Sequence, residues 1–158
     1  MEGDRIKLLT LVIVENGGEV LLGLKKRGFG IGKWNGFGGK VEAGESIADA
    51  ARRELSEEAG IDALSLEHRA ISRFRFGDDS EVLEVHTFAC SDFRGTPKET
   101  EEMHPQWFPI AKIPYDGMWP DDMHWLPKFL AGERFQAYFG FAGYDDERIT
   151  HIHFAPYS

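Results

Sequence analysis

Cysteine is scarce in this sequence: Cys90 is the one thiol in 158 residues. A lone cysteine forms no intrachain disulfide, which favours a reducing compartment such as the cytoplasm. Long hydrophobic runs are also missing, because the longest, residues 8–14, is far shorter than a membrane span. Residues 1–4 are acidic, whereas a secretory signal begins with basic residues. We therefore expect a cytoplasmic protein without a membrane segment.

Positive charge is in deficit, and the formal net charge is −9. Sequence-independent binding to DNA or RNA depends on basic surface, so we expect no nucleic-acid polymer as partner. One segment departs from this balance: residues 20–41 contain no Asp or Glu, yet hold five basic side chains, Lys25, Lys26, Arg27, Lys33 and Lys40. Acidic residues follow directly. This switch from a basic loop to an acidic segment predicts a local site for a polyanion.

The length supports one sizeable core and is too short for two ordinary domains. Repeats, low-complexity tracts and long linkers are absent, so we predict a single domain over residues 1–158. Asn16-Gly17 is a strong hairpin signal, and Ser46 and Gly60 are suited to begin and end a helix. The patterns predict strands over residues 6–14, 19–24, 68–76, 82–90, 106–110, 134–141 and 148–154, a loop over 23–39, and helices over 46–60 and 122–130. Two helices among several strands predict an α/β (mixed α+β) fold with a mixed sheet covered by helices.

Three acids on the first predicted helix form the chemical centre of the sequence. Glu54, Glu57 and Glu58 are spaced by three and four residues, so their carboxylates share one patch. Glu54 and Glu58 lie at the margin of the apolar stripe, where like charges repel unless a cation neutralises them. Hard divalent ions such as magnesium take oxygen ligands. The alternative is a solvated, glutamate-rich helix face.

The spacing around these acids matches a known signature. Gly39 is followed at fixed intervals by Glu45, Arg53-Glu54-Leu55, Glu57-Glu58 and Gly60-Ile61. The sequence thereby resembles the Nudix hydrolases. The resemblance implies an α/β/α sandwich with a mixed central sheet, and hydrolysis that depends on Mg²⁺, with Mn²⁺ as a possible substitute.

The resemblance also implies roles for residues of this helix and of the loop before it. Glu54, Glu57 and Glu58 match the metal ligands, with the Gly39 carbonyl as a frequent addition. Arg53 matches a residue that orients a glutamate, although a plain helix salt bridge would also explain it. Glu45 matches a position that closes the loop onto the helix. Candidates for the general base are Glu57, Glu58 and Glu102, and Glu102 could equally be a solvated loop charge.

Residues outside the signature are similar to one subgroup, the animal-type MutT homologues that hydrolyse oxidised purine nucleoside triphosphates. The likeness runs over residues 8–141 and includes Trp119-Pro120-Asp121-Asp122. It implies a base pocket in which Asn35, Asp121 and Asp122 face the base. Trp119 and Phe29 would lie against the ring, and the pocket would be lined by Thr10, Lys25, Phe74 and Leu83.

Two adjacent carboxyl groups shielded by aromatic side chains are expected to differ in protonation, because each charge raises the pKa of the other group. A protonated acid donates and an ionised one accepts, which suits the discrimination of oxidised purines. Alternatively, Asp121 or Asp122 caps a helix and Trp119 fills the core. We assign no site to the segment from Gly143 onward. His151 and His153 alternate on a predicted strand and could bind a metal, but we place them on the surface.

The leading hypothesis is a monomeric enzyme that hydrolyses 8-oxo-dGTP, 2-hydroxy-dATP and related triphosphates to the monophosphate and pyrophosphate, which sanitises the nucleotide pool. A runner-up substrate is a purine triphosphate alkylated on an exocyclic group. A different class is a non-catalytic nucleotide-binding module, which the three clustered acids disfavour.

Overall fold

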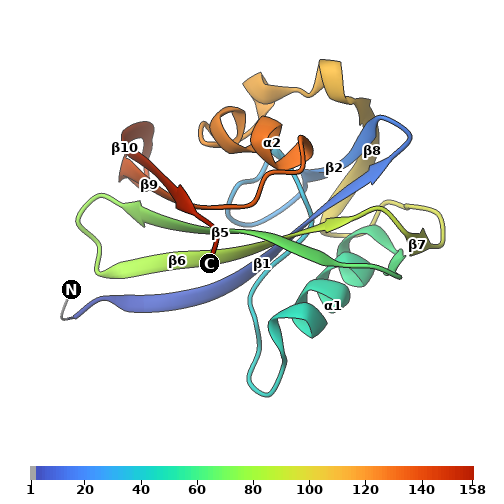
Figure 1. Ribbon diagram of the computed structural model, residues 1–158, viewed down its shortest axis with the longest axis horizontal. Coiled ribbons are helices and arrows are strands. Elements are labelled where there is room, and N and C mark those ends of the chain that lie inside the picture. The colour runs from blue at the N-terminus through green and yellow to red at the C-terminus, as the bar shows by residue number, and fades with distance from the viewer. Residues whose placement is uncertain (1–2) are drawn as a thin grey trace.

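A mixed sheet runs through the centre of the molecule, as a computed structural model describing residues 3–158 shows (Figure 1). In spatial order its strands are β10 (Asp146–Pro156), β9 (Phe135–Gly143), β5 (Glu67–Phe76), β6 (Glu81–Cys90), β1 (Arg5–Asn16), β2 (Glu19–Lys25) and β3 (Trp34–Asn35), with β8 (Met103–Pro109) paired along β2. The pairs β1–β6 and β5–β9 are parallel, and the other pairs are antiparallel. Two short strands, β4 (Asp62–Ala63) and β7 (Phe93–Arg94), form a separate small sheet.

The two helices cover opposite faces of this sheet (Figure 1). Helix α1 (Ile47–Ala59) packs Ala51 and Leu55 against a buried cluster that includes Phe37 and Phe88. Helix α2 (Asp122–Leu130) packs on the other side, preceded by the 3-10 turns η1 (Ile110–Lys112) and η2 (Tyr115–Gly117). Strand residues alternate between the two faces, which is why one sheet supports two cores. The predicted α/β/α sandwich with a mixed sheet is confirmed.

The first hairpin differs in detail from the expected one. Asn16 pairs with Glu19, so the central turn residues are Gly17 and Gly18, both with positive φ (59° and 84°), rather than Asn16-Gly17. Beyond this short ladder β2 leaves β1, and residues 36–41 take its place. They form bridges from Phe37 to Val12 and from Lys40 to Leu9. A loop is thereby held against a central strand, where it can carry a site.

Other boundaries shift for physical reasons. The strand predicted at 106–110 begins at Met103, because β8 pairs with the whole of β2. The predicted loop 23–39 contains β3, which pairs with the end of β2. Helix α1 begins after Ser46, whose hydroxyl accepts from the Asp49 N–H at 3.0 Å, and ends at Gly60 with φ 71°, as predicted. Within residues 3–158, none of the helices has the length and apolar character needed to cross a bilayer.

Candidate active site

A cavity of about 480 Å³ lies on the α2 face of the sheet. Alternate residues of β6, from Glu81 through Leu83 and Val85 to Thr87, form part of its floor, because side chains two apart share a sheet face. The loop after β2 and the segment leading into α2 supply the walls. The structure brings all nine residues of the predicted base pocket to this cavity: Thr10, Lys25, Phe29, Asn35, Phe74, Leu83, Trp119, Asp121 and Asp122.

Two adjacent carboxyl groups are buried in the cavity wall. Asp121 is 4 % exposed and Asp122 is 3 % exposed. The indole N–H of Trp125 donates to Asp121 Oδ2 at 2.9 Å and to Asp122 Oδ1 at 3.1 Å. Asp122 Oδ2 is buried without a hydrogen-bond partner among the described residues. The side chains of Asp121 and Asp122 are also hydrogen-bonded to each other, so a proton on one carboxyl group can be shared with the other.

The two carboxyl groups are held in different electrostatic states. Burial raises the pKa of Asp121 to about 6, against the lowering effect of the Trp125 hydrogen bond. Burial, together with the adjacent Asp121 charge, raises the pKa of Asp122 well above its usual range. Because two adjacent buried charges repel each other, the pair favours one proton shared between the two carboxyl groups. The pair offers one donor and one acceptor side by side.

The helix-capping interpretation of this pair does not account for the contacts. Asp121 occupies the N-cap position of α2, but its side chain accepts no hydrogen bond from the helix backbone there. Trp125 holds the carboxylates instead, since positions three and four residues apart share a helix face.

An aromatic wall stands beside the carboxyl pair. The rings of Phe29 and Trp119 are stacked, with centroids 5.1 Å apart and planes at 28°. Phe29 is 59 % exposed, so its ring is the outer layer of this wall. Phe74, on the floor, stacks on Phe139 at 5.5 Å. Phe29 thus lies on Trp119 in this structure rather than facing it across a gap.

Polar groups lie between the wall and α1. Asn35 Oδ1 accepts from the Gly36 N–H at 2.8 Å, so its amide nitrogen is the part of this side chain left to donate. The Thr10 N–H donates to the Gly39 carbonyl at 2.8 Å, and its hydroxyl lies 3.5 Å from the same oxygen. Lys25 adds a positive charge that lowers the pKa of Glu54 and Glu58 slightly, against stronger effects that raise both.

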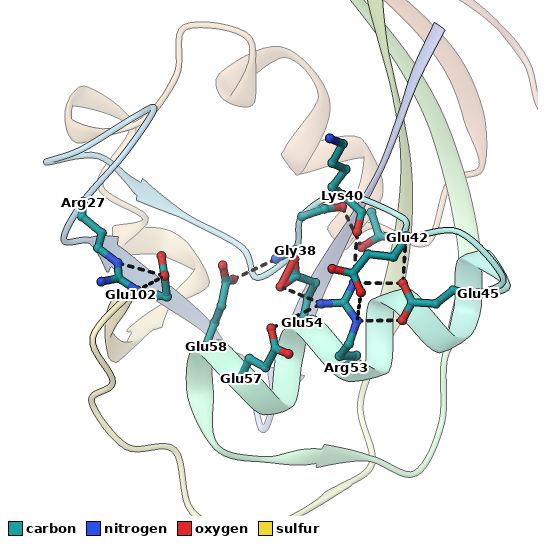
Figure 2. A network of polar contacts seen from close by, with 12 residues as sticks. Arg27, Gly38, Lys40, Glu42, Glu45, Arg53, Glu54, Glu57, Glu58 and Glu102 are labelled. Atoms are coloured by element: carbon teal, nitrogen blue, oxygen red, sulfur yellow. Dashed lines mark hydrogen bonds and ion pairs between the residues drawn. The ribbon is translucent and has the colours of Figure 1, made fainter.

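The carboxylates of Glu54 and Glu58, on α1, lie beside the loop that carries Gly38 and Lys40 (Figure 2). Glu58 is 4 % exposed, lines the cavity, and accepts from the Gly38 N–H at 3.0 Å. Burial, with the neighbouring Glu54 charge, raises the pKa of Glu58 to about 8. Burial also raises the pKa of Glu54, whose side chain contacts that of Glu57. Carboxylates crowded and desolvated in this way are stabilised as anions by a cation.

The loop approaches both β1 and α1 closely, which explains two of its glycines. A Cβ at Gly39 would lie 1.8 Å from Glu54 Oε2, and one at Gly38 would lie 1.9 Å from the Thr10 carbonyl oxygen. A side chain at Gly38 would push the loop away from β1, and one at Gly39 would push it away from Glu54. Glycine is therefore required by proximity rather than by backbone angle.

A divalent ion is chemically suited to this donor set, which consists of carboxylate and carbonyl oxygens without a thiolate or imidazole. As arranged, no three His, Cys, Asp or Glu side chains of residues 3–158 are placed to hold a metal ion together. Glu57 is turned toward Arg53, at 3.3 Å, and its side chain is 56 % exposed. Glu57 therefore contacts Glu54 while its exposed carboxylate is also paired with Arg53.

Arg53 joins the loop to the helix (Figure 2). Its Nε donates to Glu45 Oε2 at 2.6 Å, and its NH2 group donates to Glu45 Oε1 at 2.9 Å and to the Lys40 carbonyl at 3.0 Å. This bidentate pair holds the pKa of Glu45 at about 2. Arg53 thus contacts both Glu45 and Glu57. Its contact with Glu57 is a salt bridge along the helix, and the same contact can orient the Glu57 carboxylate.

Glu102 lies across from Glu58 and is paired with Arg27 (Figure 2). Arg27 Nε donates to Glu102 Oε1 at 2.9 Å, and this bond lowers the pKa of Glu102. Glu102 is thus an ionised carboxylate close enough to raise the pKa of Glu58. It is not a free loop charge.

The residues that line the cavity but were not assigned to the base pocket include Lys33, Trp125 and Tyr144. Trp125 follows Asp121 by one helical turn, and that spacing could have indicated it. Tyr144 lines the cavity, although no site was assigned to the segment from Gly143 onward. His151 and His153 are exposed, as predicted.

A mixed sheet between two helices, with a carboxylate-bearing helix beside a cavity of nucleotide size, is the architecture of Nudix-type hydrolases. The NUDIX domain matches residues 7–129, and the chain belongs to this family, whose members generally use divalent metal ions. It is 53 % identical to the oxidized purine nucleoside triphosphate hydrolase of Danio rerio over 139 residues, covering 88 % of this chain and 89 % of the relative. The Mus musculus protein of the same name is 48 % identical with the same coverage. The crystal structure of the MutT protein from Bacillus halodurans superposes with a TM-score of 0.83 at 26 % identity, covering 94 % of this chain and 97 % of that one.

Proposed function

We propose that this Nudix hydrolase cleaves oxidised purine nucleoside triphosphates, including 8-oxo-dGTP and 2-hydroxy-dATP, to the monophosphate and pyrophosphate. In this way it would remove damaged precursors from the nucleotide pool. The observation that carries the substrate assignment is the buried pair Asp121 and Asp122, whose pKa values are both raised and which share a cavity with the stacked rings of Phe29 and Trp119. The names of the Danio rerio and Mus musculus relatives support the same substrate class.

The pair can distinguish oxidised guanine by the direction of one hydrogen bond. Guanine presents an acceptor at N7, whereas 8-oxoguanine presents an N–H donor there. An ionised carboxylate accepts from that donor and repels the lone pair of the undamaged base. The protonated neighbour and the Asn35 amide supply donors for the remaining base acceptors. Since a proton can move within the pair, more than one oxidised purine can be matched.

Magnesium is the proposed metal, with manganese as a substitute, and Glu54, Glu57, Glu58 and the Gly39 carbonyl would hold it. When bound, the ion would supply charge neutralisation at the phosphates and polarisation of a water. The raised pKa values of Glu54 and Glu58 support this, and Glu57, which contacts Glu54 and is paired with Arg53, would complete the set. The Gly39 carbonyl already accepts from Thr10, so it would contribute its second lone pair.

Hydrolysis requires that water attack a phosphorus atom, here the β-phosphorus, while the bond to the bridging oxygen breaks and the nucleoside monophosphate leaves. A carboxylate must accept the proton of the attacking water. Glu57, Glu58 and Glu102 are the candidates, and Arg53 and Arg27 hold two of them. Lys25, at the cavity edge, would offset phosphate charge.

We further propose that the chain acts as one domain over residues 1–158, as a cytoplasmic monomer. Its substrate would be a free nucleotide rather than a nucleic-acid polymer or a membrane. The net charge of −9 supports this, because affinity for a large polyanion needs broad basic surface.

The test is a comparison of kcat/KM for 8-oxo-dGTP and dGTP with Mg²⁺, with the products identified. We expect a clear preference for the oxidised nucleotide and release of pyrophosphate. Equal values would refute the oxidised-base assignment, and a preference for a triphosphate alkylated on an exocyclic group would establish the runner-up substrate.

A further inference from the structure

The hairpin of β9 and β10 reaches the rim of the cavity. Tyr144, in its turn, stacks on Phe76 with ring centroids 4.8 Å apart and planes at 12°. Its hydroxyl donates to Asp79 Oδ2 at 2.6 Å, which ties the hairpin to the turn between β5 and β6. Because Tyr144 also lines the cavity, the C-terminal hairpin extends the aromatic wall.

A second contact joins this hairpin to the loop after β2. Glu147 Oε1 lies 2.9 Å from Lys33 Nζ. The same ammonium lies over the Trp119 ring, 5.0 Å from its centroid. Lys33 lines the cavity, and its side chain is 24 % exposed. Lys33 thus links the loop after β2 to the β9–β10 hairpin, at the Trp119 ring in the cavity wall.

The position of this ion pair distinguishes it from an ordinary surface pair, which contributes little. The loop that ends at Lys33 also carries Phe29, which stacks on Trp119. Gly30 lies so close that a Cβ there would be 3.4 Å from the indole nitrogen. A cation held over an aromatic face is stabilised by the ring. Lys33 and Glu147 therefore help to fix the orientation of Trp119 and the loop on it.

We propose that Glu147 and Lys33 are positioning residues for the nucleotide base: Glu147 holds Lys33 against Trp119, and this sets the geometry of the wall on which the base packs. The inference rests on the proposed use of this cavity as the nucleotide site. Within residues 3–158, the side-chain contacts of Lys33 and Glu147 are with each other and with Trp119 rather than with Glu54, Glu57 or Glu58. Loss of the pair should therefore weaken substrate binding without slowing the cleavage step.

A double-mutant cycle with Lys33→Met and Glu147→Gln tests this, with KM and kcat measured separately for 8-oxo-dGTP. We expect KM to rise about fivefold in Lys33→Met and about threefold in Glu147→Gln, with kcat within about twofold of wild type. The double variant should be no worse than Lys33→Met, because Glu147 acts through the lysine. Lys33→Arg should restore KM, since a guanidinium can form both contacts.

Lys128→Met is the matched control. Lys128 also forms an ion pair, with Glu133 at 3.7 Å, and lies 5.3 Å from the centroid of an aromatic ring, that of Phe154, but it does not line the cavity. Its KM should equal that of wild type. Thermal unfolding of every variant separates lost binding from lost folding.

Additive effects in the cycle, an unchanged KM, or a loss confined to kcat would each overturn the positioning role. Failure of the proposed function has a different signature: wild type would then show no preference for 8-oxo-dGTP over dGTP. The cycle still applies in that case with dGTP as the substrate. Calorimetry with 8-oxo-dGMP gives the same comparison without turnover.

Discussion

Burial of Asp121 and Asp122 is the feature on which base recognition depends at the scale of single residues. A carboxyl group whose pKa is raised in the folded state favours folding below its unfolded pKa, near 3.8. That contribution is lost as the pH rises toward the folded pKa. For Asp121 the window runs from about pH 4 to about 6, and for Asp122 it continues higher.

Asp122→Asn tests how the raised pKa of Asp122 makes the stability of the protein depend on pH. Asparagine keeps an oxygen for the Trp125 N–H and an amide to donate to Asp121, so it mimics the protonated acid. We expect the free energy of unfolding of wild type to fall relative to this variant, by at most about 1.4 kcal/mol per pH unit above pH 4. Urea unfolding at several pH values gives the comparison. A difference that stays constant with pH would show that Asp122 is ionised in the folded protein.

Glu58→Gln separates the effect of the buried Glu58 carboxylate on stability from its proposed role in metal-dependent turnover. The glutamine oxygen can still accept from Gly38, and no charge can form at this position at a pH above about 8, where Glu58 itself ionises. We expect the Tm without metal to be unchanged or higher, and kcat with Mg²⁺ to fall by roughly a thousandfold. Ser56→Ala, on the exposed side of α1, is the control. Turnover that survives in Glu58→Gln would remove Glu58 from the proposed metal site.

At the scale of elements, residues 36–41 form the loop that lies between β1 and the acids of α1. Alanine at its two adjacent glycines, Gly38 and Gly39, should have different effects, because a Cβ at each would meet a different neighbour. Gly39→Ala places a Cβ against the end of the Glu54 side chain, which can swing aside. We therefore expect a folded protein with activity lowered about a hundredfold. Gly38→Ala places a Cβ 1.9 Å from the backbone oxygen of Thr10, which has little freedom to move.

For Gly38→Ala we expect unfolding to become easier by about 3 kcal/mol or more. Thermal unfolding and kcat measured on both variants give the test. Equal losses of stability in the two variants would mean that the loop and β1 are not held as closely as described.

Much of the molecule follows from local sequence patterns. The α2 bounds, the caps of α1 and most strands could be predicted, because periodicity and capping chemistry are local. The base-pocket residues were chosen by resemblance, and the structure gathers them at one cavity. The contact between Lys33 and Glu147 could not be predicted, because it depends on the parallel pairing of β5 with β9, which no local pattern encodes. Trp125 was missed because a buried indole is also an ordinary core residue.

At the scale of the whole molecule, the central claim is that one face of the sheet recognises the base while the helix on the other face supports cleavage. The ratio of kcat/KM for 8-oxo-dGTP to that for dGTP, compared between wild type and Asp121→Asn, tests this most directly. We expect the ratio to fall about tenfold or more in Asp121→Asn, while kcat for dGTP changes by less than about threefold. An equal loss on both nucleotides would contradict the claim, because Asp121 would then support the reaction in general rather than the choice of base.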